Sequence, residues 1–180
     1  SLLEAKERGI GLVCYEAGHD AQHRRGVLLV TELRRAIAQN QLSLVYQPLV
    51  RVTSGALTHF EALVRWNHPT LGPISPAEFV PLAERGAAIA DLTQWVLGAV
   101  VDQLRRWRHA GQRARVAVNL SASDVADTSL PRFILGLLGK AGVSAEQLIF
   151  EVTESAIMRE PQTAIQVMEQ LRAAGSRFAV

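Results

Sequence analysis

The sequence predicts an α/β fold with a largely parallel sheet. From residue 31 onward, short apolar runs typical of β-strands alternate with stretches in which apolar residues recur at helical spacing. Three of the helical stretches are followed by a glycine, which favours the end of a helix. Because strands that alternate with helices usually form parallel sheets covered by those helices, we expect this architecture here.

The first part of the pattern consists of one helix and two strands. Residues 31–40 are predicted to be helical because their apolar residues lie about one turn apart. Residues 42–47 alternate between apolar and polar side chains, which predicts a strand. We expect Pro48 to end this strand, because proline has no N–H to donate to a sheet. A second, mostly apolar strand is predicted at residues 56–66.

The second part repeats helices and strands. Ser75, followed by a proline and two residues later a glutamate, predicts a helix that starts at residue 76. Apolar residues between positions 92 and 107 recur at helical spacing, and the tryptophans among them are expected to pack in the core. Similar signals predict the remaining elements: strands at residues 115–120, 148–153 and 177–180, and helices at residues 130–141 and 161–174.

Residues 1–30 differ from the rest in composition. The first 15 residues have the pattern of a helix closed by Gly9 and followed by a short strand. The next segment is polar and contains two glycines, two histidines and a pair of arginines, as linkers often do. We therefore expect residues 1–15 to be the end of a preceding domain, residues 16–30 to be a linker, and residues 31–180 to be the main domain.

Composition and charge exclude several classes of function. The chain has 180 residues, 48% hydrophobic and 20% charged, as in a globular domain with a sizeable core. Its formal net charge of +2 is too small to indicate binding to a nucleic-acid polymer. The apolar runs are shorter than a membrane span, so we expect no membrane contact from this segment, although an anchor elsewhere in a longer protein is compatible with it. The single cysteine, Cys14, favours a reducing compartment and hence a cytoplasmic location.

Three strands each carry one oxygen-bearing side chain at or near the carboxyl-terminal part of an apolar run: Glu61, Asn119 and Glu151. A carboxylate in a buried strand is costly unless a metal, a cation or hydrogen-bond donors compensate its charge. Because active sites of α/β barrels are built where the strands end, we expect the three side chains to meet. Two carboxylates and a carboxamide are hard oxygen ligands, which suit Mg²⁺ or Mn²⁺ better than zinc or copper.

Each of these residues also has a purely structural explanation. Glu61 is compatible with a surface position or with an ion pair to a nearby arginine. Asn119 is compatible with a turn or a helix cap. Glu151 and the nearby Glu154 are compatible with a helix start, where the helix dipole favours acidic side chains. His68, which precedes a proline, is expected to be a turn residue rather than a ligand.

Five motifs occur in order along the chain. They are Tyr46-Gln47-Pro48, the segment FEALVRWNHP at residues 60–69, the segment ISPAEFVPLAE at residues 74–84, Val118-Asn119-Leu120-Ser121 and Glu151-Val152-Thr153-Glu154-Ser155. Together they resemble the EAL domain, the cyclic di-GMP phosphodiesterase family, from about residue 31 to residue 180. In addition, residues 4–15 resemble the closing helix and strand of a GGDEF domain, which often precedes an EAL domain in one polypeptide.

The resemblance implies a partial TIM-like (β/α) barrel with roughly its first five strands present, the first of them antiparallel to the others. It implies hydrolysis of one phosphodiester bond of cyclic di-GMP to linear pGpG by two Mg²⁺ or Mn²⁺ ions, and a homodimer of the full-length protein. By position in the motifs, Glu61, Asn119 and Glu151 match the family's metal ligands. Glu61, Glu151 and Glu154 match its catalytic residues, and Glu154 matches the glutamate that steadies a dimer-contacting loop. Gln47 and Arg65 match residues that contact the dinucleotide, and the alternative role for Arg65 is an ion pair with a neighbouring carboxylate.

The main departure from the family is at the end of the chain. A paired-aspartate motif, a lysine and a further glutamate complete the two-metal site in the family, and the chain ends within the strand that precedes them. We therefore expect the 180-residue segment alone to fold poorly and to be inactive, with an incomplete metal site. Asp124 is a smaller departure, because the family often has glutamine there, and we expect a minor local effect. The alternative function is a degenerate EAL module that binds cyclic di-GMP or a protein partner without cleaving it.

Overall fold

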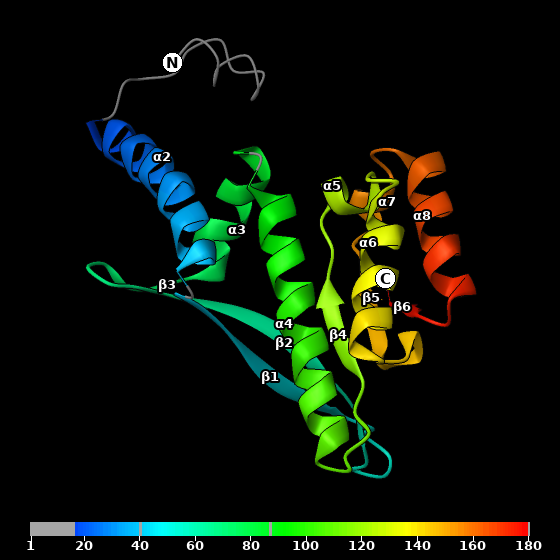
Figure 1. Cartoon of the computed structure of the whole chain (residues 1–180). Helices are drawn as coiled ribbons and strands as arrows, with labels where there is room; N and C mark the ends of the chain where they lie inside the picture. The colour runs from blue at the N-terminus through cyan, green and yellow to red at the C-terminus, as the bar shows by residue number, and fades with distance from the viewer. Residues whose placement is uncertain (1–16, 40, 87, 180) are drawn as a thin grey trace.

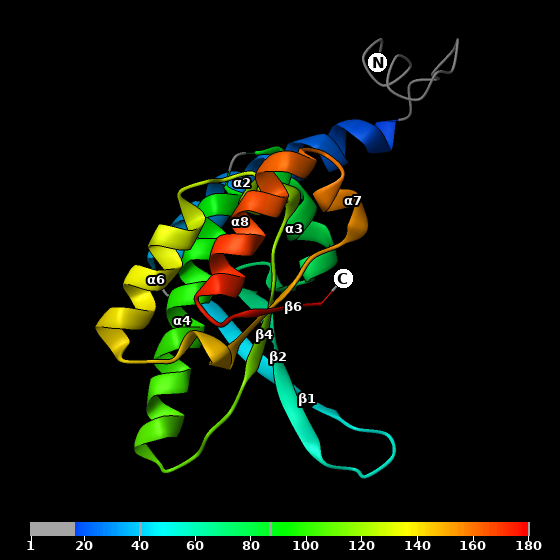
Figure 2. The same ribbon diagram turned by 90° about the vertical axis from the view of Figure 1, so that its right-hand side faces the viewer.

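The computed structural model of the chain describes residues 17–39, 41–86 and 88–179, and Figures 1 and 2 show it in two views. The predicted end of a preceding domain, residues 1–15, lies outside these described residues. The described part is an α/β structure with one six-stranded sheet. Within these ranges, no helix is both long and apolar enough to cross a membrane.

The sheet follows the order β1-β2-β4-β5-β6, with the short strand β3 paired to β2. Strand β2 is antiparallel to β1 and β3, whereas β2, β4, β5 and β6 are mutually parallel. The predicted sheet with its antiparallel first strand is therefore confirmed. The strands are β1 (Leu42–Val50), β2 (Leu57–His68), β3 (Gly72–Ile74), β4 (Val116–Asn119), β5 (Leu148–Glu151) and β6 (Arg177–Ala179).

The helices alternate with the parallel strands and cover one face of the sheet. In Figure 1, α4 lies across β2 and β4, and α6 and α8 lie beside it over β5 and β6. Two short helices, α5 and α7, follow the carboxyl ends of β4 and β5 directly. The helices are α2 (Ala17–Ala38), α3 (Pro76–Arg85), α4 (Ile89–His109), α5 (Ala122–Val125), α6 (Leu130–Ala141), α7 (Glu154–Ile157) and α8 (Pro161–Ala173), with a 3₁₀ helix, η1 (Ala145–Gln147).

The hydrophobic core lies between the sheet and these helices. Val118 and Phe150 are buried on the helix-covered face and pack with Leu97 and Leu104 of α4. A second cluster packs Trp66 of β2 against Leu33 of α2. Because successive strand residues point to opposite faces, this arrangement sends the alternate residues of β2, β4 and β5 to the face without helices. That face carries the candidate site.

Two predicted element boundaries were wrong. The first strand does not end at Pro48 but continues to Val50. Because β1 is an edge strand, no hydrogen bond to a neighbouring strand is lost through the missing N–H of the proline. The first helix does not begin at residue 31: residues 17–30, predicted to be a linker, are helical in continuity with it. Burial of Leu29, Leu33 and Ala36 along one stripe of α2 stabilises this longer helix.

Several local signals were interpreted correctly. Ser75 is the N-cap residue of α3 and Pro76 occupies its first turn, although the Ser75 side chain makes no capping hydrogen bond. Gly142 ends α6 in the left-handed conformation with φ 63°. His68, which was expected to be a turn residue, is the last residue of β2, and its Nδ1 accepts hydrogen bonds from the backbone N–H groups of Thr70 and Leu71 in the turn that follows, both at 3.2 Å.

Candidate active site at the carboxyl ends of the strands

Glu61 and Asn119 are brought together by the pairing of β2 with β4. Glu61 lies beside Ala117 in the parallel register, and Asn119 follows two residues later on the same face of β4. The Asn119 Nδ2 amide donates a hydrogen bond of 2.9 Å to Glu61 Oε1. Glu61 is half-buried, so this donor compensates a carboxylate that is partly removed from water. We expected Glu61, Asn119 and Glu151 to meet, and this hydrogen bond joins the first two of them.

Glu151 lies on the far side of Asn119. It is the last residue of β5 and is aligned with Asn119 in the parallel register, which places both side chains on one face at one level. Burial raises the pKa of the Glu151 carboxyl, and the negative charge of Glu61 raises it further, whereas nearby His59 opposes the shift. The two carboxylates thus repel each other across Asn119, and a bound cation would relieve that repulsion.

The donor chemistry fits a hard divalent cation. Because the Asn119 Nδ2 group faces Glu61, its amide oxygen remains as an acceptor beside the two carboxylates. Mg²⁺ is commonly held by one or two carboxylates together with waters and substrate phosphates, and the oxygens present here are of that type. Among the described residues, no three His, Cys, Asp or Glu side chains gather into a metal-binding cluster, so the candidate site consists of two carboxylates and the amide of Asn119.

Gln47 and Arg65 lie on the same face of the sheet as Glu61. Gln47 is paired with Glu61 across the antiparallel β1–β2 ladder, and Arg65 follows Glu61 by four residues on β2. Gln47 is exposed, and Arg65 is half-buried. Arg65 Nη1 donates to the backbone oxygen of Val64 at 2.9 Å. Within the described ranges Arg65 has no carboxylate partner, so the ion-pair alternative for this residue is not realised there.

A cavity of about 420 Å³ adjoins these residues. It lies between the carboxyl-terminal half of β2, helices α3 and α4, and the end of β4, and both Arg65 and Asn119 line it. Its walls combine apolar side chains with a few polar groups, as is typical of ligand sites. Arg65 keeps further guanidinium N–H groups for a ligand in this cavity.

Glu154 is the first residue of α7, on an element different from those that carry Glu61, Asn119 and Glu151. It is exposed in the first turn of α7, where Thr153 is the N-cap residue and its hydroxyl accepts from the N–H of Ala156 at 3.3 Å. This is the position that the helix-start alternative describes. The alternative does not apply to Glu151, which ends β5 rather than starting a helix. No hydrogen bond or ion pair among the described residues joins Glu154 to Glu61, Asn119 or Glu151, so its role stays a prediction.

Two further residues lie near the site: His59, to which the sequence analysis assigned no role, and Asp124, for which it predicted only a minor local effect. His59 lies two positions before Glu61 on the same face of β2, and strand alternation is the signal that places it there. Asp124 is buried and fixes the loop after Asn119: its Oδ2 accepts from the Ser121 N–H at 2.7 Å, the Ser121 hydroxyl at 2.6 Å and the Thr93 hydroxyl at 3.0 Å. Burial raises the pKa of the Asp124 carboxyl, and the hydrogen bonds from Ser121 and Thr93 oppose that shift.

The sheet thus combines an antiparallel first strand, a run of parallel strands and oxygen-bearing side chains at the strand ends. The EAL domain family model matches residues 30–180, and the chain is a member of that family. EAL domains have a TIM-like barrel fold, and the predicted partial barrel with five principal strands agrees with it.

Named relatives and solved structures are similar to this chain over most of its length. It is 38% identical to the cyclic di-GMP phosphodiesterase PA2567 of Pseudomonas aeruginosa over 98% of this chain and 30% of that protein. It is 36% identical to the bifunctional diguanylate cyclase/cyclic di-GMP phosphodiesterase MucR of the same organism over 100% of this chain and 27% of that protein. The chain thus spans less than a third of the length of these relatives.

Solved structures give the same family. The PaMucR phosphodiesterase in complex with c-di-GMP superposes with a TM-score of 0.80 at 38% identity, covering 85% of this chain and 62% of that one. The FimX EAL domain of Xanthomonas citri, in complex with c-diGMP, has a TM-score of 0.78 at 23% identity over 88% of this chain and 62% of that one, a likeness of fold alone.

Proposed function

We propose that the full-length protein is a cyclic di-GMP phosphodiesterase that hydrolyses one phosphodiester bond of its substrate to give linear pGpG. The observation that carries this proposal is the contact of Asn119 with Glu61 beside Glu151, on one face of an EAL-family sheet. The relatives named as cyclic di-GMP phosphodiesterases support the substrate and the reaction.

Phosphodiesterases of the EAL family generally depend on a metal ion, and we infer Mg²⁺ or Mn²⁺ here. Glu61, Asn119 and Glu151 would hold it through oxygen. When bound, such ions supply an activated water and stabilise negative charge on the reacting phosphate. The hydrogen bond from Asn119 orients the Glu61 carboxylate, which fixes one ligand before the ion arrives.

The remaining residues of this chain would bind and orient the substrate. Arg65 offers guanidinium N–H groups in a fork that matches phosphate oxygens, and Gln47 offers an exposed amide opposite Glu61. Glu154 would steady the loop that follows β5, next to the proposed homodimer contact. A cytoplasmic location, inferred from the use of cysteine in the sequence, completes the proposal.

Turnover of cyclic di-GMP by the full-length protein tests this function. We expect hydrolysis to pGpG with Mg²⁺ or Mn²⁺, none after chelation with EDTA, and a loss of at least about 100-fold for Glu61→Ala, which removes a ligand. Glu169→Gln is the matched control, because Glu169 is exposed on α8 away from the site. Full turnover by Glu61→Ala, or binding of cyclic di-GMP without cleavage by the unmodified protein in Mg²⁺, would contradict the proposal.

A further inference from the structure

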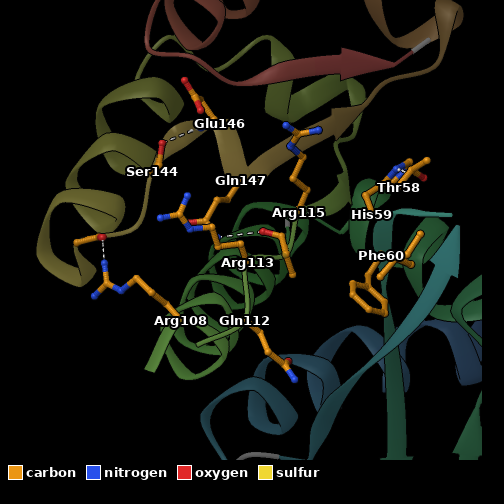
Figure 3. Close-up of a pocket in the computed structure, with 13 residues that line it drawn as sticks. Thr58, His59, Phe60, Arg108, Gln112, Arg113, Arg115, Ser144, Glu146 and Gln147 are labelled. Carbon is orange, nitrogen blue, oxygen red and sulfur yellow. Dashed lines mark hydrogen bonds between the residues drawn. The ribbon is translucent and has the colours of Figure 1, made fainter. Parts of the chain in front are cut away.

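A second cavity, of about 610 Å³, lies near the amino ends of the strands. It is bounded by the start of β2, the loop between α4 and β4, and the segment from the end of α6 through η1 (Figure 3). Asn119 and Glu151, by contrast, are the last residues of their strands. The volume is within the range of small-molecule sites, and the proposed hydrolysis gives this cavity no role.

The cavity is electropositive. Three arginines and one glutamate supply its charged side chains, so cations outnumber anions even with its histidine neutral. A concave surface with an excess of one charge concentrates ligands of the opposite charge. Figure 3 shows Arg108, Arg113 and Arg115 on one side of the cavity and His59 and Phe60 on the other. The glutamate is Glu146.

One of the arginines has a structural role. The Arg108 guanidinium donates hydrogen bonds to the backbone oxygens of Gly142 and Ala141, the latter at 3.3 Å. These carbonyls end α6, where the helix dipole favours a cation. The guanidinium of Arg108 is therefore already engaged in the cavity wall, and we do not expect Arg108 to be the main ligand-binding residue.

Arg113 and Arg115 have no such partners. Both are exposed, and neither forms an ion pair or a side-chain hydrogen bond with any other described residue. Their backbone, however, is fixed: Gln147 Nε2 donates to the Ala114 oxygen at 3.0 Å, and the Phe60 N–H donates to the Arg115 oxygen at 2.9 Å. Two unpaired guanidinium groups on a fixed backbone suit the oxygens of a phosphoryl group.

The opposite wall is suited to a flat apolar group. Phe60 lines the cavity, and its ring is held by Trp107 with 5.2 Å between the ring centroids. We propose that this cavity binds a small ligand of the nucleotide class, with its phosphates at Arg113 and Arg115 and its ring against Phe60. Glu61, Asn119 and Glu151 do not line this cavity, although its His59 is near enough to Glu151 to influence that carboxyl.

Binding of ATP to the full-length protein in EDTA tests this inference by calorimetry. We expect ATP to bind, inorganic pyrophosphate to bind more weakly because it lacks a ring, and adenosine to bind at least about tenfold more weakly because it lacks phosphate. The double variant Arg113→Ala/Arg115→Ala should weaken ATP binding at least about tenfold, and raised salt should do the same in part. Arg132→Ala, which removes an exposed arginine of α6 outside the cavity, should leave binding unchanged.

Three outcomes would overturn the inference. The first is no ATP binding at physiological ionic strength, and the second is equal binding by the double variant and the unmodified protein. The third is loss of ATP binding in Glu61→Ala with retention in the double variant, which would place the ligand in the catalytic site. Cyclic di-GMP turnover by the double variant shows that it is folded, and failure of the proposed hydrolysis would leave the ATP result unaffected.

Discussion

Replacement of Glu151 by glutamine should stabilise the metal-free protein while weakening the proposed metal site. Strand β4 separates β2 from β5, so Glu61 and Glu151 stand on strands about 10 Å apart at two strand spacings. Two unit charges as far apart as these strands repel by about 0.4 to 1.7 kcal/mol for effective dielectric constants between 80 and 20, and side chains that converge on one ion would repel more. Both carboxylates are partly exposed, so we take the lower part of this range, about 0.5 to 1 kcal/mol.

The sign of the pH dependence follows from the raised pKa of Glu151. Because folding raises this pKa, the folded state binds the carboxyl proton more tightly than the unfolded state does. The metal-free protein therefore loses stability as the pH rises from the ordinary glutamate pKa through the raised one, and the full penalty is present at neutral pH. Glutamine at position 151 should remove both the penalty and this part of the pH dependence.

Thermal unfolding of the full-length protein measures both effects. In EDTA at pH 7, Glu151→Gln should raise the Tm of the EAL domain by about 1 to 4 °C, and near pH 4 this gain should shrink. Addition of Mg²⁺ or Mn²⁺ should raise the Tm of the unmodified protein but much less that of the variant. Glu169→Gln, an exposed control on α8, should change neither value. A lower Tm in EDTA together with an intact metal-induced rise would refute the reasoning about both repulsion and ligation.

Two further substitutions test other parts of the structure. Arg65→Lys keeps the charge but loses the fork of N–H donors, so the KM for cyclic di-GMP should rise about tenfold; an unchanged KM would remove Arg65 from the substrate site. Gly142→Ala should destabilise the protein by about 1 to 2 kcal/mol, because φ is 63° there and the new Cβ would approach Arg108 Nη1 to 3.2 Å. Gly136→Ala is the control, because Gly136 lies in the exposed middle of α6. Denaturant unfolding should show that this variant gains about 0.5 to 1 kcal/mol in the free energy of unfolding. An equal loss in both variants would contradict the argument from φ.

The order of helices and strands could be predicted because apolar periodicity records which face of each element is buried. Boundaries were harder where tertiary packing overrides a local signal. In the sequence, Pro48 predicts the end of a strand whether that strand is central or at the edge of a sheet. Among the described strands β1 pairs only with β2, and this pairing shows that β1 is an edge strand. The polar start of α2 gave no sign that residues 17–30 are helical, because its stabilising contacts lie on α3, far along the sequence.

The candidate site was predictable in outline for a related reason. Parallel strands bring their carboxyl ends to one edge, so oxygen-bearing residues at those ends meet wherever the strands pair in sequence order. The register that puts Asn119 level with Glu151 is set by the whole sheet and cannot be obtained from one strand. The arginine-lined cavity lacked any such rule, because Arg113 and Arg115 lie on the connection between α4 and β4, whose placement depends on contacts such as that of Gln147 with Ala114.

The carboxylate of Glu61 links these levels. Its neighbours Phe60 and Ala62 are directed toward the helix-covered face, so alternation alone sends Glu61 to the other face, beside Asn119. Burying a carboxylate in an apolar strand costs free energy, and the hydrogen bond from the Asn119 amide offsets part of that cost before any ion binds. The amide does not remove the charge, and Glu151 adds a second one. The sheet therefore holds two mutually repelling carboxylates in place, and a bound divalent cation would compensate both charges.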